Sequence, residues 1–306
     1  MGENPLQAST DQERQAVLTK IQQMDKWEEV GAHRPIGQLW YSIGITLIAV
    51  ILSFGFLALI VSVVYPYPEI KGYFKIADTF FLLVFQIFDM GTAFSVDRFI
   101  GEWRVKDQRK MIKYMQFFFW YQMLTGLVQI LLISIAVFYW MRYTQLAYLS
   151  WIFLIIVAKQ WPCISTSLKN SLEGLQRFDK ATIMEFLLAD VIKDFMAVGL
   201  ILIGRWYGRA NPQLGELFGA TLGLAFGGYL VEFIAILIGG RFFSQAMKPF
   251  GYTIKDAFKV TFDWPIVKEC FWYGFQVSII PSINTLTTTW MLIMYVNALP
   301  DRKSVV

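Results

Sequence analysis

The stretch LLADVIKDFMAVGLILIG, residues 187–204, sets the fold class of this chain. It is long and apolar enough to enter a membrane as a helix, yet it contains Asp190, Lys193 and Asp194. These three residues are spaced at i, i+3 and i+4, so on a helix they share one face and can pair. A charge near the bilayer centre costs about 2.5–3.5 kcal/mol or more unless it faces protein or water. The stretch therefore predicts a membrane helix that lines a polar cavity.

The composition agrees with a membrane protein. Of the 306 residues 56% are hydrophobic and only 16% are charged, whereas a soluble domain carries about 25% charged residues. The net charge of +4 fits basic membrane loops and gives no reason to expect nucleic acid binding. Cys163 and Cys270 lie far apart, and His33 is the single histidine. We therefore expect no metal site, no cofactor beyond a coupling ion such as Na⁺ or H⁺, and no enzymatic activity.

Seven apolar runs are long enough to span a membrane, which takes about 20 residues for a ~30 Å hydrocarbon core. We therefore expect an all-α polytopic membrane protein with about seven transmembrane helices. The expected spans are Leu39–Tyr65, Tyr73–Phe94, Met115–Trp140, Leu146–Ile164, Ile183–Ile203, Leu214–Gly239 and Phe271–Val296.

The basic residues predict the orientation of these spans. Fourteen lysines and arginines lie in the loops after the second, fourth and sixth spans, against five in the loops after the first, third and fifth. Because positive residues stay inside, the even loops and the N-terminus are expected in the cytoplasm of a multi-pass plasma membrane protein. This orientation, and the absence of lysine from the last span, argue against a seven-span retinal protein.

The chain is expected to divide into five parts. Residues 1–38 form a polar cytoplasmic tail whose apolar residues, at helical spacing, predict an amphipathic surface helix. Residues 39–243 form a first lobe of six helices, 244–270 a basic cytoplasmic connecting segment, and 271–300 the first helix of a second lobe. The ending DRKSVV, residues 301–306, back-translates to a common sequencing adapter. We therefore expect it to be an artefact and the natural chain to continue.

The polar residues inside the spans are the candidate site. They include Glu185 near the cytoplasmic mouth and Glu232 towards the cytoplasmic side of the sixth span. An alternative remains open, in which two aspartates neutralise Lys193 and the three charges hold helices together. A ladder of glycines in the sixth span (Gly215, Gly219, Gly223, Gly227 and Gly228) predicts close helix packing. The expected cavity residues are Asp190, Lys193, Asp194, Glu185, Glu232, Gln276 and Asn284.

Three features together resemble the polysaccharide-flippase branch of the MATE/MOP transporter superfamily, the Wzx-type or RfbX-type flippases. The first is DMGTAFSVDRFIGEWRVKDQ at residues 89–108. The second is NSLEGLQRFDKATIMEF at residues 170–186, which is similar to the family's L-x-G-x-x-R-F connection. The third is the basic segment after the sixth span, followed by WYGFQVSIIPSI. The resemblance implies two helical lobes around a cavity that opens alternately to each side, of which this chain would be the N-terminal part.

The resemblance also implies a function. The substrate would be a lipid-linked oligosaccharide, and the partners would be membrane lipids and glycan-biosynthesis membrane proteins. Lys193 would meet the phosphate, while Asp190 and Asp194 would hold Lys193 or carry a coupling proton or sodium ion. Arg98 and Arg177 would attract the anionic head group at the cytoplasmic mouth.

Three other functions stay open. A MATE-type cation-coupled multidrug or small-molecule antiporter would suit an excess of acids in the cavity. A non-transporting membrane scaffold or subunit would use the charges only for assembly. A membrane-embedded enzyme would need catalytic acids in a large outer loop, and the loops predicted to lie outside are short.

Overall fold

The computed structural model describes residues 15, 40, 43–48, 50–51, 64, 68–144, 147, 150–157, 163–186 and 192–298. Regular structure within these ranges is entirely helical, with no strand, which confirms the all-α class. The predicted N-terminal surface helix, most of the first span and the ending at 301–306 lie outside the described residues. The elements are α4 (Pro68–Asp89), α5 (Thr92–Lys106), α6 (Gln108–Tyr139), η1 (Met141–Tyr143), α7 (Ser150–Ile156), α8 (Ile164–Gly174), α9 (Phe178–Glu185), α10 (Lys193–Ala210), α11 (Gly215–Met247), η5 (Lys248–Phe250), α12 (Ile254–Ala257) and α13 (Trp264–Ala298).

Two helices are long and apolar enough to cross a membrane, which indicates a membrane protein. They are α6 continued through η1, Gln108–Tyr143, and α11 continued through η5, Gly215–Phe250. The predicted third and sixth spans fall on these two helices. A third candidate is the pair α4–α5, whose axes are bent by 51° and which overlaps the predicted second span.

The other expected spans are only partly described or are not among the candidate membrane helices. The seventh lies within α13, one helix that continues through Pro281 but is not among the candidate spans. Of the fourth, residues 147, 150–157 and 163–164 are described. Of the expected fifth span, Ile183–Ile203, residues 183–186 and 192–203 are described and helical, and residues 187–191 lie outside the described part. A total of seven spans therefore stays a prediction.

The break between α4 and α5 is fixed by α13. Met90 and Gly91 both have positive φ, 47° and 71°, and such a conformation strains residues other than glycine. A Cβ on Gly91 would lie 2.2 Å from the carbonyl oxygen of Gly274 on α13. Ser95, one turn into α5, donates to the carbonyl of Cys270 at 2.7 Å. Helix α13 thus packs with its backbone directly against the bend.

Aromatic side chains fill the core at the end of the bundle where α5 meets α6. Asp107 is extended and caps α6, accepting the N–H groups of Arg109 and Lys110 at 2.9 and 3.3 Å, which stabilises the helix start. Phe119 of α6 then packs edge-on against Phe243 of α11, with ring centroids 5.8 Å apart. This core joins α5, α6, α8, α11, α12 and the start of α13.

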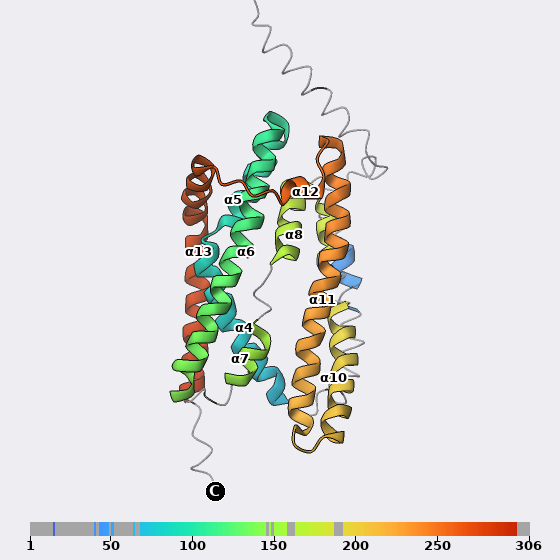
Figure 1. Ribbon diagram of the computed structural model, residues 1–306, viewed down its shortest axis with the longest axis vertical. Helices are drawn as coiled ribbons and strands as arrows, with labels where there is room; N and C mark the ends of the chain where they lie inside the picture. The colour runs from blue at the N-terminus through green and yellow to red at the C-terminus, as the bar shows by residue number, and fades with distance from the viewer. Residues whose placement is uncertain are drawn as a thin grey trace, which may run out of the picture.

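The glycine ladder packs α11 against α10, as predicted. A Cβ on Gly219 would lie 2.2 Å from the Gly204 oxygen, and one on Gly223 would lie 2.1 Å from the Leu200 oxygen. A Cβ on Gly228 would meet nothing within 4 Å. Backbone-to-backbone contact therefore depends on part of the ladder only. Figure 1 shows α10 and α11 side by side along one edge of the bundle.

Several basic residues of the even loops lie at one end of the bundle. The α5–α6 turn and α12 lie at the upper end in Figure 1, and the α10–α11 turn and the C-terminal end of α6 lie at the lower end. The α5–α6 turn and α12, which hold Lys106, Arg109, Lys110 and Lys255 of the fourteen basic residues of the even loops, therefore share one end. Which end faces the cytoplasm stays a prediction.

Substituting Gly219 by alanine should destabilise the protein by roughly 1–3 kcal/mol, as overpacking does, because the added methyl forces α10 and α11 apart. The matched control is Gly228→Ala on the same helix, which meets open space and gains helix propensity. Thermal unfolding of both variants in detergent micelles checks this. Equal melting temperatures would show that the ladder does not hold the pair together.

Candidate functional site

The structure describes only part of the charged group Asp190, Lys193 and Asp194. Lys193 is the first residue of α10 and is exposed. Asp194 follows it in the first turn of α10, and neither the position of Asp190 nor the side chain of Asp194 is described. The predicted pairing of the three charges on one face therefore stays a prediction. Ile192, directly before Lys193, is also helical, and residues 187–191 lie outside the described part, so the place of Lys193 within the predicted fifth span stays a prediction.

The two predicted glutamates contact helix α8 from two different helices. Lys169 of α8 lies 2.9 Å from the Oε2 of Glu185 on α9. Ser165 of α8 donates to the carboxylate of Glu232 on α11. The predicted Gln276 and Asn284 are exposed on α13. The structure thus joins Glu185 and Glu232 through α8 and leaves the two amides on the surface of the described part.

Helix α8 is a polar helix with one apolar face. Leu168 and Leu172 lie fully in the core. Ser165, Ser167 and Ser171 are also buried, so a polar side of α8 is enclosed by neighbouring helices. Buried hydroxyl groups need partners, since an unsatisfied one costs about 1–3 kcal/mol. Sequence reasoning assigned α8 to a loop because its residues form no apolar run.

Asp97 brings a further carboxylate to α8 from α5. Its Oδ1 is buried and has no hydrogen-bond partner among the described residues, and the same holds for the Oγ of Ser171. Lys169 and Glu173 of α8 both act on its charge, the lysine attracting and the glutamate repelling. Asp97 is therefore a half-buried acid with one oxygen that no described group satisfies.

Acids outnumber bases around α8. Lys169 contacts Glu173 at 3.8 Å and Glu185 at 2.9 Å. It is the one basic residue of the group defined below. Burial raises the pKa of Glu173; Lys169 opposes this rise and Glu185 adds to it. We call the following group the α8 seam: Asp97, Ser165, Lys169, Glu173, Glu185 and Glu232.

A second buried carboxylate lies at the α4–α5 break. Asp89 is 4% exposed, and its Oδ1 accepts Thr92 at 2.8 Å and Gln122 of α6 at 2.6 Å. The sequence analysis did not single out Asp89. Its position at the end of an apolar run, two residues before a glycine, is the signal that could have found it.

The two predicted head-group arginines have different environments. Arg177 forms a two-pronged ion pair with Asp179, with contacts of 3.1 and 2.9 Å between largely buried side chains. Arg98 lies over the ring of Tyr273 at 4.3 Å and near that of Phe99 at 5.9 Å. No described carboxylate pairs with Arg98, so of the two only Arg98 keeps its charge available.

The L-x-G-x-x-R-F connection is a tight turn attached to α5. A Cβ on Gly174 would lie 2.8 Å from the Cβ of Ile100, so a larger residue would push the turn off α5. Arg104 of α5 donates to the carbonyl of Leu175 and to the Gln176 side chain. Arg177 then fixes the start of α9 through Asp179. The glycine and the arginine of the motif thus each make a specific contact in the turn.

Comparisons with protein-family models, with curated proteins and with solved structures found no match for this chain. Function therefore has to be inferred from the chemistry of the seam and from the motifs quoted above.

The seam can hold a proton or a small cation. Carboxylate and hydroxyl oxygens are the groups that bind hard cations, and the seam has four carboxylates against one ammonium. No group of three or more histidine, cysteine, aspartate or glutamate side chains in the described part is arranged to hold a metal ion. A proton or a weakly held monovalent ion is accordingly the better occupant.

Replacing Arg177 by glutamine should destabilise the protein by about 3 kcal/mol, because the buried Asp179 then loses its partner. Arg177→Gln combined with Asp179→Asn should recover part of this loss. The control is Arg98→Gln, whose exposed contacts with aromatic rings are worth about 1 kcal/mol or less. Unfolding curves in detergent micelles measure all three. If Arg177→Gln unfolds like Arg98→Gln, Arg177 does not hold the turn.

Proposed function

We propose that the chain belongs to a membrane transporter that works by alternating access, with the α8 seam as the site of its coupling ion. The observation that carries the proposal is Glu232. Residues 217–240 of α11 contain no other charged residue, and the Glu232 carboxylate accepts a hydrogen bond from Ser165 on α8. An ionisable residue inside an apolar membrane helix is costly and by default marks a pathway or a relay.

The seam supports coupling because it lies where four helices meet. Asp97 comes from α5, Lys169 and Glu173 from α8, Glu185 from α9 and Glu232 from α11. A cation bound among these acids would reduce their repulsion and favour the arrangement in which the helices close around it. Losing the cation would favour a more open arrangement. An ion can shift such an equilibrium only through a difference in affinity between the two states, and the excess of acids supplies one.

The substrate proposed from the motif resemblance is a lipid-linked oligosaccharide. Its sugar and phosphate head would cross through a polar cavity while the lipid tail stays in the bilayer. Arg98, with no described acidic partner, suits first contact with the anionic head at the basic end. We do not propose this role for Arg177, because its guanidinium forms an ion pair with Asp179. The proposed setting is the plasma membrane, beside other glycan-biosynthesis membrane proteins.

A second substrate class is favoured by one specific observation, the acid excess of the seam. A cation-coupled antiporter for organic cations would use the same carboxylates for both the substrate and the coupling ion. The two proposals share the fold and the coupling site and differ only in the sign of the transported charge.

Reconstituted vesicles test the proposal. With a fluorescent short-chain polyprenyl-diphosphate N-acetylglucosamine as the probe, wild-type protein should speed its translocation, and a proton or sodium gradient should increase the rate. Glu232→Gln should lower the gradient-driven rate by about ten-fold or more, a typical coupling factor. The matched control is Glu102→Gln, since Glu102 lies on α5, outside the seam, and pairs with Lys106 at 2.7 Å.

The outcomes separate the candidates. Gradient-driven export of ethidium, with no movement of the sugar lipid, would favour the organic-cation antiporter. Rates equal to those of protein-free vesicles for both probes would favour the scaffold and contradict transport. A Glu232→Gln variant as active as Glu102→Gln would remove the seam from the mechanism.

A further inference from the structure

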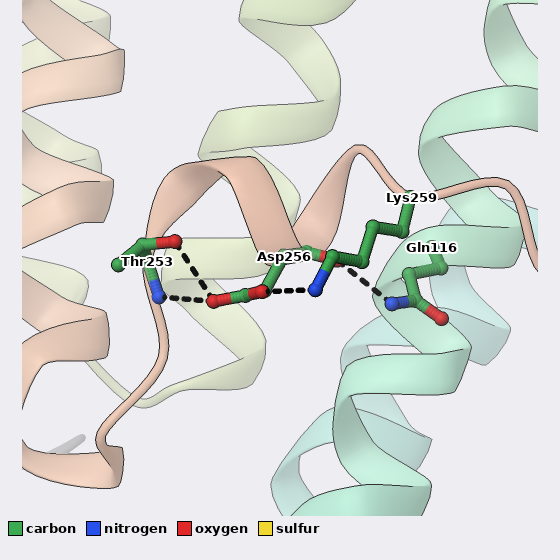
Figure 2. A network of polar contacts seen from close by, with 4 residues as sticks. All are labelled: Gln116, Thr253, Asp256 and Lys259. Atoms are coloured by element: carbon green, nitrogen blue, oxygen red, sulfur yellow. Dashed lines mark hydrogen bonds and ion pairs between the residues drawn. The ribbon is translucent and has the colours of Figure 1, made fainter.

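The segment between α11 and α13 is held rigidly on the end of the bundle. We call residues 251–264 the strap; it contains the short helix α12. Asp256 accepts the backbone N–H and the hydroxyl of Thr253 at 2.9 and 2.8 Å, and Lys259 contacts its other oxygen at 2.7 Å. Gln116 of α6 donates to the carbonyl of Asp256 at 2.7 Å. Figure 2 shows this network joining the strap to α6.

Two further contacts fix the second half of the strap. The indole of Trp120 on α6 donates to the carbonyl of Phe258 at 2.9 Å. Lys113 of α6 forms an ion pair with Asp263 at 2.7 Å. The strap is therefore held by α6 at three points, residues 256, 258 and 263.

The held strap presents large apolar side chains to its surroundings. Val260 is 63% exposed, Phe262 46% and Trp264 74%. Trp264 begins α13, and Trp272, eight residues on and therefore on the same helix face, is also exposed. The apolar surface of the strap thus continues into an apolar face that runs along α13.

The strap and the residues that flank it in sequence also carry positive charge. The strap and the start of α13 contain acids, but Asp256 pairs with Lys259, Asp263 with Lys113, and Glu269 lies 3.9 Å from Lys110. Three exposed lysines remain that no described acid balances. They are Lys248, Lys255 and Lys268.

We propose that the strap is a binding surface for anionic lipid head groups, and that it lies in the head-group layer of the membrane. Val260, Phe262 and Trp264 enter the boundary with the acyl chains, as apolar residues of interfacial segments do. Lys248 and Lys255 pair with lipid phosphates, and the long side chain of Lys268, one turn further along α13 than Trp264, reaches back to the same layer. The occupant is a lipid surface and not a soluble partner, because the apolar face continues along α13 towards the membrane interior. This inference depends on membrane placement of the bundle and not on the transported substrate.

Hydrogen exchange gives a local measurement. The N–H groups of Val260, Thr261 and Phe262 take part in no described hydrogen bond, so they exchange rapidly unless something covers them. The full chain is compared in nanodiscs of phosphatidylcholine alone and of phosphatidylcholine with added phosphatidylglycerol. We expect exchange at residues 260–262 to slow several-fold when phosphatidylglycerol is present, while the α10–α11 turn at the other end does not change.

Variants test whether the three lysines cause the slower exchange in the presence of phosphatidylglycerol. The triple variant Lys248→Gln, Lys255→Gln and Lys268→Gln should lose the response to phosphatidylglycerol. Arg142→Gln, a charge change at the opposite end, should keep it. Unchanged exchange elsewhere in the same map confirms that each variant is folded.

Three results would overturn the proposal. The first is equal exchange at residues 260–262 in both bilayers. The second is a phosphatidylglycerol response that the triple variant keeps in full. The third is protection that rises with the number of chains per disc, which would mean that a second copy covers the strap.

Discussion

Helix α8 brings three buried serines and a lysine among the apolar side chains of the core, and the surrounding helices have to satisfy them there. An unpaired polar group in such an interior costs more than a paired one gains. Glu232 of α11 and Glu185 of α9 are positioned by this requirement, the first by a serine and the second by Lys169. Leu168 and Leu172 of α8 hold it in the aromatic core. Asp97 and Ser171 each keep one buried oxygen that no described group satisfies.

The two long apolar helices and the glycine packing could be predicted from the sequence, because continuous hydrophobicity and four-residue spacing are local signals. Glu232 could be predicted for the same reason, as a lone charge in an apolar run. Asp97 and Lys169 could not be predicted, since each is one of several charges in a polar stretch. Only the packing of α5 against α8 distinguishes them from surface residues.

The partner of Arg177 shows another limit of reasoning from spacing. Residues two apart do not face each other on a helix, so spacing alone gave no reason to pair Arg177 with Asp179. Arg177 lies just before α9 with non-helical backbone angles, φ −94° and ψ 56°, and this lets its side chain reach forward. The glycine of the same motif is explained by contact with Ile100. Structural contacts thus account for the glycine and the arginine in L-x-G-x-x-R-F, and the proposed transport function rests more on the seam than on this motif.

The membrane crossing itself is tested most directly by cysteine accessibility from each side. Gln213→Cys lies in the turn between α10 and α11, and Lys255→Cys lies at the basic end; both positions are exposed. The account predicts that a membrane-impermeant maleimide labels Gln213→Cys in intact cells and Lys255→Cys only in inverted membrane vesicles, above the wild-type background. Labelling of both positions from the same side would contradict a bundle that spans the membrane with its basic end inside.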